Sequence, residues 1–406
     1  MTESHTPVSI ELFAYPWDIV DDGPARFAEE CRGLGVTRLH VATAYHSGKF
    51  LLPRSSRRKV HFAESGTAYV PLDASELGKL QPLLSPLAAL KWLEELAGTG
   101  MPLSGWTVFH HNSRLGSMCG QWTTRNVFGD PYPFALCPSH EEVRDYSVSL
   151  AKAVARLGFF STVDLETIGF LGYFHGHHHE VNAGPLGPLE KFLLSLCFCD
   201  GCRNSAVRDD IAVDELATQV RDLLLLKLKA DDSNSSNRTN MEQIAALLAQ
   251  SSELAQFIRM RMNRVTGLVK NIHAEVAPVK VSAFTSSFVG SPSNIWMEGV
   301  SMAHLRDTVE TFHLLAYTSD SGAVNDDLLF CIAQVKDPAK LNLTLNLGLP
   351  LTPDLGDAVT KVMFAEKHGV RRFSFFNYGF LGEGRLRWIA ELAYALRGGK
   401  IASSHG

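Results

Sequence analysis

Short apolar segments alternate with longer amphipathic segments along most of the chain. The apolar segments are rich in β-branched and aromatic residues, as strands are. The predicted strands are Ile10–Ala14, Arg38–Ala44, Gly105–His110, Thr162–Glu166, Val279–Thr285, Phe312–Tyr317, Leu341–Leu347 and Arg372–Phe376. The segments between them have helical periodicity, for example Glu142–Arg156 and Pro353–His368. About eight strand–helix units in alternation predict the α/β class and a (β/α)8 TIM barrel.

The longest gap between predicted strands covers residues 167–278 and follows the fourth strand. It contains a His-rich stretch, three cysteines and two long helical patterns separated by a polar stretch at residues 229–240. We therefore predict one barrel domain over residues 1–406, with residues 167–278 as a helical insertion in it.

Composition and charge argue against a nucleic-acid-binding or membrane protein. The chain has 406 residues, 45% of them hydrophobic, a net charge of −5 and a pI of about 6.3. Its basic cluster, Arg54–Lys59, is short, so we expect no nucleic-acid partner. The first residues lack a basic stretch followed by an apolar one, and no apolar run is long enough to span a bilayer. We expect a cytoplasmic protein without a membrane partner, and the sequence leaves homo-oligomers open.

Four of the seven cysteines have the spacing of a metal site. Cys197, Cys199 and Cys202 fall within six residues, and Cys137 lies upstream of the fourth strand. In a reducing compartment such a cluster indicates metal rather than disulfides. Four thiolates complete a tetrahedral zinc shell and leave no open position, so we predict a structural zinc.

Polar and aromatic residues follow many of the predicted strands. Active sites of (β/α)8 barrels lie at the carboxyl ends of the strands, where these residues would meet. Aromatic rings stack on sugar faces, and Asn, His and Arg reach hydroxyl or carboxylate oxygens, so this set favours a small polar or acidic carbohydrate as the partner. The predicted substrate-binding residues are Trp17, Tyr45, His46, His110, His111, Asn112, Arg114, His175, Asn377 and Tyr378.

Two carboxylates end the fourth strand. Asp164 and Glu166 are two residues apart, so both side chains point to one face. In an apolar setting Glu166 would have a raised pKa and could protonate a leaving oxygen, while a second carboxylate supports the oxocarbenium centre. We predict Glu166 as the acid, Asp164 or Asp320 as the second carboxylate, and Tyr317 as a group that orients it or stabilises charge.

The stretch from Gly172 to Glu180 holds four histidines. It lacks the helical His spacing of a catalytic metal motif. Substrate contact by His175, a catalytic divalent metal and a structural role all remain open at this point.

These motifs resemble the zinc-bearing β-galactosidases of glycoside hydrolase family 42. The resemblance rests on the strand-four glutamate, the Leu-Cys137-Pro segment and the Cys-aromatic-Cys-x-x-Cys pattern at residues 197–202. The segments Ala42–Pro53 and His111–Gly116 also resemble a group of uncharacterised bacterial barrel proteins regarded as glycosidases. The resemblance implies that Cys137, Cys197, Cys199 and Cys202 bind zinc and that Glu166 is the general acid/base.

The chain departs from that family at two places. Leu165 stands where the family has Asn, and the predicted seventh strand carries no glutamate to serve as nucleophile. A second resemblance, to family 18 chitinases, concerns the Asp-x-Glu at the end of strand four and a tyrosine on strand six. Those enzymes use the acetamide of the substrate as nucleophile, and Asp164, Glu166 and Tyr317 fit their roles.

The leading hypothesis is therefore a glycoside hydrolase that uses carboxylate acid/base catalysis. One alternative is a metal-dependent isomerase, lyase or amide hydrolase that uses the histidines. The other is a barrel that binds a sugar without cleaving it.

Overall fold

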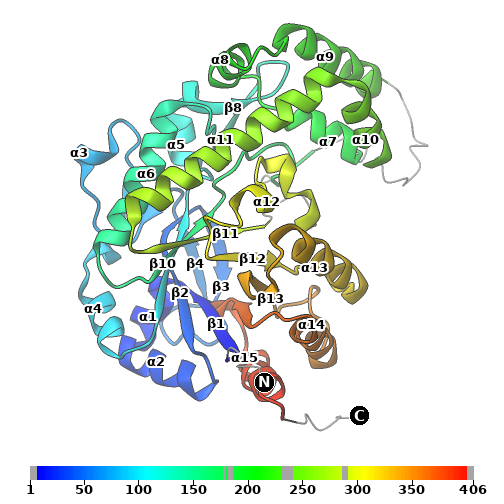
Figure 1. Cartoon of the computed structure of the whole chain (residues 1–406). Coiled ribbons are helices and arrows are strands. Elements are labelled where there is room, and N and C mark those ends of the chain that lie inside the picture. Colours follow the sequence, from blue (N-terminus) through cyan, green and yellow to red (C-terminus); the bar gives the residue numbers. More distant parts are fainter. Residues whose placement is uncertain (1–6, 177–178, 182–185, 230–240, 286–290, 400–406) are drawn as a thin grey trace.

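Eight parallel strands form a closed barrel in the computed structural model, which describes residues 7–176, 179–181, 186–229, 241–285 and 291–399 (Figure 1). The strands follow one another around the ring in chain order, and β1 closes it by pairing with both β2 and β14. They are β1 (Ser9–Ala14), β2 (Arg38–Tyr45), β7 (Leu103–Val108), β10 (Thr162–Glu166), β11 (Lys280–Phe284), β12 (Thr311–Leu315), β13 (Leu341–Asn346) and β14 (Arg372–Phe376). The predicted (β/α)8 fold is confirmed.

The predicted strand ends differ from the observed ones by up to two residues. The largest shift is at β7, which begins at Leu103 instead of Gly105 and ends before Phe109. Phe109 and His110 continue the pattern of β7 beyond its last residue. Their amides donate to the carbonyls of Glu166, the last residue of β10, and of Thr167, which follows it. Sequence pattern alone does not separate such a strand extension from the strand itself.

Helices surround the barrel, as the amphipathic segments predict. The helices that follow the strands are α1 (Pro16–Asp22), α2 (Pro24–Gly33), α4 (Lys91–Gly98), α6 (Glu141–Arg156), α12 (Met302–Leu305), α13 (Ser321–Val335), α14 (Leu355–Lys367) and α15 (Glu383–Leu396). No helix in the described ranges has both the length and the apolar character needed to cross a bilayer.

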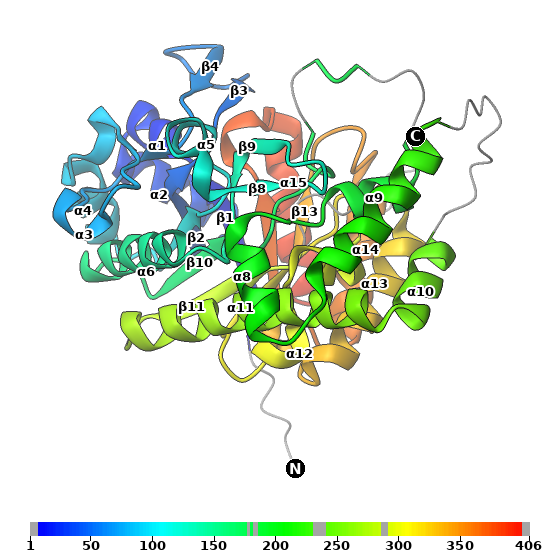
Figure 2. The ribbon, with the colours of Figure 1, turned by 90° about the horizontal axis from the view of Figure 1, so that it is seen from above.

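Small elements follow β2 and β7. After β2 the chain forms a hairpin of β3 (Gly48–Leu51) and β4 (Val60–Ala63), which stands out from the rest of the ribbon in Figure 2. After β7 it forms α5 (Ser113–Met118) and a second hairpin of β8 (Thr123–Arg125) and β9 (Pro131–Leu136). The short elements β5 (Thr67–Ala68), α3 (Ala74–Leu77) and β6 (Leu83–Leu84) lie between β4 and α4.

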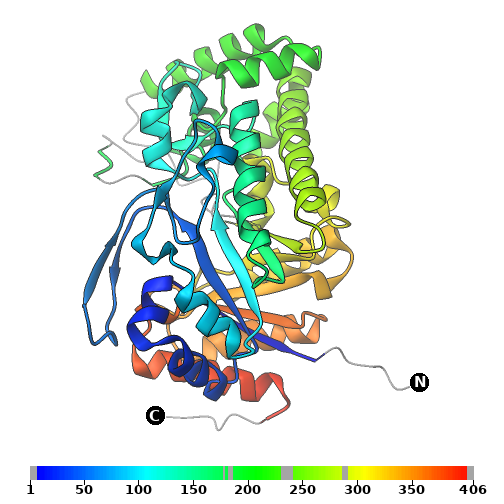
Figure 3. The same cartoon turned by 90° about the vertical axis from the view of Figure 1, so that its left-hand side faces the viewer.

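The segment between β10 and β11 carries a group of helices. They are α7 (Pro188–Leu194), α8 (Asp200–Arg208), α9 (Val213–Lys229), α10 (Met241–Gln250) and α11 (Ser252–Val276). Helices α8, α9 and α10 gather near one end of α11 in Figure 1. The long α11 then returns along α6, and Figure 3 shows these two helices side by side.

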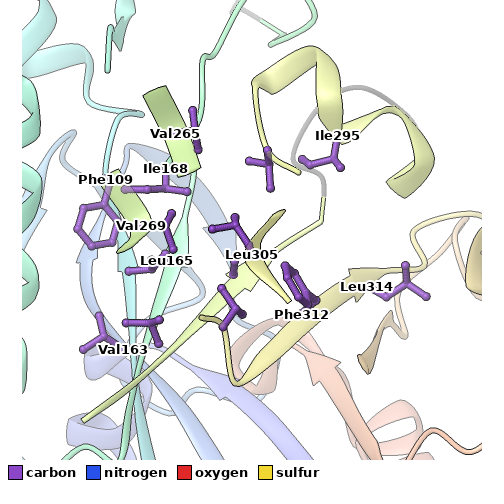
Figure 4. Packing of buried hydrophobic residues seen from close by; sticks show 14 of the residues in the cluster. Phe109, Val163, Leu165, Ile168, Val265, Val269, Ile295, Leu305, Phe312 and Leu314 are labelled. Carbon is purple, nitrogen blue, oxygen red and sulfur yellow. The ribbon is translucent and has the colours of Figure 1, made fainter. Parts of the chain in front are cut away.

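Alternation along β10 decides which side chains enter the barrel. Val163 and Leu165 face outward and pack in one apolar layer with Val265 and Val269 of α11 (Figure 4). Side chains of a strand alternate between its two faces, so Asp164 and Glu166 point into the barrel. The apolar packing of α11 therefore fixes the register that presents both carboxylates to the interior.

Candidate active site

Glu166 is the last residue of β10 and lies at the carboxyl end of the barrel. Its Oε2 accepts a hydrogen bond from the indole Nε1 of Trp106, a buried residue of the neighbouring β7. Burial raises the pKa of Glu166 to about 7, and the hydrogen bond from Trp106 only partly opposes this shift. A carboxyl group with such a pKa is protonated in about half of the molecules at neutral pH, as a general acid requires.

Three tyrosines lie close enough to Glu166 to feel its charge. Burial raises the pKa values of Tyr15, Tyr45 and Tyr317, and the negative charge of Glu166 adds to each shift. The Tyr15 hydroxyl donates to the Tyr45 hydroxyl at 2.9 Å, and the Tyr45 ring packs edge-on to Trp106 at 5.0 Å. Neutral phenols around a carboxyl group provide donors for ligand oxygens while keeping the group poorly solvated.

Asp164 lies one strand layer below Glu166 and is held by a buried polar network. Its Oδ2 is 2.6 Å from His40 Nδ1, while His40 Nε2 is 2.7 Å from Glu11 Oε2. His313 Nε2 is 3.7 Å from Asp164 Oδ1. Asn342 Nδ2 donates to Glu11 Oε2 at 2.7 Å, so five strands contribute one side chain each to the network.

The charge states follow from these contacts. Burial would lower the pKa of His40, but Asp164 and Glu11 together raise it to about 9. Burial would raise the pKa of Asp164, but the charge of His40, the hydrogen bond from His40 and the nearby imidazole of His313 hold it below its usual range. His40 is therefore a cation between two carboxylates, and Asp164 is an ionised carboxylate with a structural partner.

Three residues of this network could also bind a metal ion. One ligand atom each of His40, Asp164 and His313 lie within 4.8 Å of one another. However, both His40 nitrogens already lie within 2.7 Å of a carboxylate oxygen, which is a hydrogen-bond distance. The two N–H groups of the His40 cation, one donating to each carboxylate, explain these contacts without an ion.

Asp320 and Tyr317 follow β12 but have different surroundings. Asp320 is exposed, and its Oδ1 accepts a hydrogen bond from the amide of Ala323, so it is the N-cap of α13. Tyr317 is half-buried, and its ring lies 6.0 Å from the ring of Phe376. Of the two residues, Tyr317 is the one near Glu166.

Three imidazoles stack beside Tyr45. The His46 ring lies 4.2 Å from both Tyr45 and His111, and His175 meets His111 edge-on at 4.1 Å. Burial lowers the pKa of His46 to about 4 and that of His111 well below its usual value. The rims of β2, β7 and β10 thus share a set of packed rings, in which burial disfavours the charged forms of His46 and His111. His177 and His178 lie outside the described residues.

Four of the predicted substrate-binding residues have structural partners. His110 faces α6, where Nε2 contacts the Ser147 hydroxyl at 3.0 Å. Asn112 caps α5 through Leu115, and Asn377 accepts a hydrogen bond from the Gly379 amide. These contacts stabilise the loops that leave the barrel.

Tyr378 is the fourth of these residues. Its hydroxyl oxygen lies 2.6 Å from Asp22 Oδ2 and 2.8 Å from Glu30 Oε2 and donates its one hydrogen between them, and the Arg54 guanidinium lies 4.1 Å from its ring centre. The side chain therefore binds α1 and α2 together on the outside of the barrel.

Trp17 and Arg114 complete the predicted set. Trp17 is buried and stacks on Tyr15 at 4.3 Å, so it supports the ring next to Glu166. Arg114 is exposed on α5. Arg114 therefore leaves its charged group accessible to a ligand, whereas the Trp17 ring is covered.

The sequence did not reveal His40, Trp106 and Tyr15 as site residues. Each is buried inside a predicted strand or directly after it. Their inward direction could have been read from alternation with Leu39, Gly105 and Ala14, but their partners lie on other strands.

The four cysteines come together as predicted. Cys137 follows β9, and its Sγ lies 3.5 Å from those of Cys199 and Cys202 and 3.8 Å from that of Cys197. All four are buried, with sulfurs within 4.8 Å of one another. A tetrahedral zinc with Zn–S bonds of about 2.3 Å needs sulfurs about 3.8 Å apart, so the cluster fits zinc.

Groups around the sulfurs also suit thiolates. The Arg125 amide donates to Cys197 Sγ at 3.3 Å, and the Ser139 hydroxyl lies 3.3 Å from Cys202 Sγ. Such contacts orient metal ligands and stabilise their charge.

Two cavities of about 330 Å³ each lie away from Glu166. One is at the amino end of the barrel between Arg38, Lys340 and Arg372, and the other is lined by Val20, Leu87 and Trp92. Neither contains a predicted site residue.

No protein-family description and no curated protein matches the sequence. Solved structures match over nearly the whole chain. The PgaB (BpsB) glycoside hydrolase domain from Bordetella bronchiseptica has a TM-score of 0.58 at 11% identity, covering 95% of this chain and 99% of that chain. The β-amylase catalytic domain from Paenibacillus polymyxa has a TM-score of 0.57 at 11% identity, covering 97% and 99%.

A third match is the β-galactosidase from the psychrophilic Marinomonas ef1, with a TM-score of 0.56 at 10% identity. The match covers 96% of this chain and 59% of that one. At these identities the likeness demonstrates a shared barrel fold.

Proposed function

We propose that this chain is a glycoside hydrolase in which Glu166 is the general acid. The observation that carries the proposal is the carboxyl group of Glu166 at the end of β10, with its pKa raised to about 7 among Trp106 and three tyrosines. The proposal is also supported by the structurally similar proteins, which include a glycoside hydrolase domain, a β-amylase and a β-galactosidase.

The second catalytic group decides the mechanism. Asp164 is paired with His40, and Asp320 caps α13, so both suggested carboxylates already have a partner. A substrate that supplies its own nucleophile removes the need for a second free carboxylate. This favours a sugar with a 2-acetamido group over a double displacement through an enzyme carboxylate.

In that reaction the acetamide oxygen attacks the anomeric carbon while Glu166 protonates the leaving oxygen. The Glu166 carboxylate then takes a proton from the water that opens the cyclic intermediate. The hydroxyl groups of Tyr317 and Tyr45 would orient the acetamide and the sugar next to Glu166.

The decisive experiment compares aryl 2-acetamido-2-deoxyglycosides and chito-oligosaccharides with aryl galactosides and glucosides, using wild type and Glu166→Gln. We expect the wild type to turn over the acetamido substrates and Glu166→Gln to lower this turnover about 10²–10⁴-fold. Equal turnover by the variant would exclude Glu166 as the acid. Binding of these sugars without cleavage would favour the sugar-binding alternative.

We also propose that Cys137, Cys197, Cys199 and Cys202 hold a structural zinc ion. Four protein ligands leave no position for substrate, so the ion would stabilise the fold and not take part in the reaction. Loss of activity on removal of a second, histidine-bound metal would instead favour the isomerase, lyase or amide hydrolase alternative.

A further inference from the structure

Arg261 is a fully buried cation. It lies on α11 with about 1% of its surface exposed. Within the described part of the chain, none of its three guanidinium nitrogens has a hydrogen-bond partner. A buried charge without compensation strongly destabilises the folded state. Something nearby must therefore offset the charge of Arg261.

The cysteine cluster lies beside it. Phe257, one helical turn before Arg261, stacks on Phe198 at 5.3 Å, and Phe198 stands between Cys197 and Cys199 in the chain. Arg261 interacts electrostatically with Cys137, Cys197 and Cys202, and with the buried carboxylate of Glu298. The face of α11 that carries Arg261 thus packs against the thiol cluster.

Neutral thiols would not compensate a guanidinium. Four thiolates around one divalent ion would, because such a centre keeps two negative charges. That centre is itself buried and needs a positive neighbour for the same reason.

We infer that Arg261 is the internal counter-cation of the metal–thiolate centre. The inference rests on the proposed zinc site and adds a residue outside its ligand set that determines how tightly the ion is held. The carboxylate of Glu298 offsets part of the charge of Arg261, the thiolate centre supplies further negative charge, and Arg261 is the positive neighbour that this centre needs.

Arg261 also links the centre to the strand of the acid. Its guanidinium carbon lies 4.5 Å from the ring centre of Phe170, four residues after Glu166. The Phe170 amide donates to the Glu298 carbonyl at 2.7 Å. The segment after β10 is therefore held between Arg261 and Glu298.

The test uses the full chain as wild type, Arg261→Met and the matched control Arg259→Met, which removes an exposed arginine from the same helix. Each protein is prepared zinc-loaded and zinc-stripped. Zinc affinity is measured by competition with a chromogenic chelator, and thermal midpoints are measured in both states.

We expect Arg261→Met to weaken zinc binding about 10–100-fold, as loss of groups around a metal centre does. Its thermal midpoint should fall further below that of wild type in the loaded state than in the stripped state, because only the loaded centre carries the negative charge that Arg261 offsets. Arg259→Met should match wild type in both states.

An equal loss of stability in both states, with unchanged zinc affinity, would overturn the inference and leave Arg261 as a packing residue. A wild type that binds no zinc would overturn the zinc site and the inference together. If Arg261→Met does not fold, Arg261→Lys and Arg261→Gln decide the question. They differ by one charge, so equal zinc affinities in this pair would overturn the inference.

Discussion

The indole N–H of Trp106 donates a hydrogen bond to the carboxylate of Glu166 across the β7–β10 pair. This bond stabilises the ionised form of Glu166, whereas burial destabilises it. Burial has the larger effect, so the pKa of Glu166 is raised to about 7. A general acid works only while protonated, so the activity of the wild type should fall as pH rises through about 7.

Trp106→Phe should move this alkaline limb to higher pH, because the variant loses the donor that stabilises the carboxylate. The measurement is kcat/KM against pH for the cleaved acetamido glycoside. Trp388→Phe, which changes a residue of α15, is the control. An alkaline limb that stays in place would show that the limb does not report Glu166.

Glu166→Gln should lower turnover about 10²–10⁴-fold, since the amide keeps the shape but cannot donate the proton. Substrates with acidic leaving groups, such as dinitrophenyl glycosides, should lose much less. Circular dichroism and the thermal midpoint should show that the fold is unchanged. An equal loss on good and poor leaving groups would assign another role to Glu166.

The His40 network should make stability depend on pH in a defined window. The pKa of His40 is about 9 in the folded chain and near 6.5 when unfolded, so its contribution is complete below about 6.5 and disappears as pH rises through 9. Glu11, with a pKa of about 2, contributes above its unfolded value near 4.5 and stops contributing as pH falls through 2.

His40→Asn should therefore lower the free energy of unfolding by about 3–5 kcal/mol at pH 6, because it leaves two buried carboxylates without their cation. Urea unfolding between pH 6 and 9 measures both the loss and the flattened pH dependence. Adding Glu11→Gln should recover part of the loss. Unchanged pH dependence in His40→Asn would mean that His40 is not the titrating group.

Cys199→Ser should lower zinc content and thermal stability together, while Cys331→Ser, at a buried cysteine outside the cluster, should keep the zinc. Elemental analysis of the purified proteins gives the stoichiometry. Wild type without zinc would leave the four sulfurs as a packing cluster.

Arg114→Ala and Tyr378→Phe should have opposite effects. Arg114 is exposed on α5, so its loss should weaken binding of acidic sugars and leave the thermal midpoint unchanged. The Tyr378 hydroxyl lies within hydrogen-bond distance of Asp22 and Glu30, so its loss should lower stability by about 1–3 kcal/mol and leave binding unchanged. Calorimetric titration measures binding, and thermal unfolding measures stability, for both variants. A stability loss in Arg114→Ala together with a binding loss in Tyr378→Phe would contradict these assignments.

The barrel could be predicted because its strands are continuous apolar runs and its helices are amphipathic. The position of Glu166 followed from the same pattern, since Val163 and Leu165 had to face outward. The thiol cluster followed from spacing, because few arrangements other than metal ligation bring cysteines so close.

The environment of Asp164 could not be predicted. Its partner His40 is 124 residues away in the chain, and only barrel closure brings the two together. Asp320 illustrates a signal that was present but ambiguous, because an aspartate after a strand is equally suited to a rim and to a helix N-cap. The sequence around Asp320 cannot distinguish a site residue at the rim from a helix N-cap, since both stand between the end of a strand and the start of the next helix.

The thiol cluster joins chain positions on either side of the acid. Cys137 and Cys197 are 60 residues apart, and α6, β10 and Glu166 all lie between them. With an ion bound, this stretch becomes a closed loop, and closing it restricts the unfolded chain by on the order of 4 kcal/mol. Loss of the metal should therefore first increase local unfolding of the chain between Cys137 and Cys197. Amide hydrogen exchange would rise around β10 while the half of the barrel formed by β12–β14 stays protected.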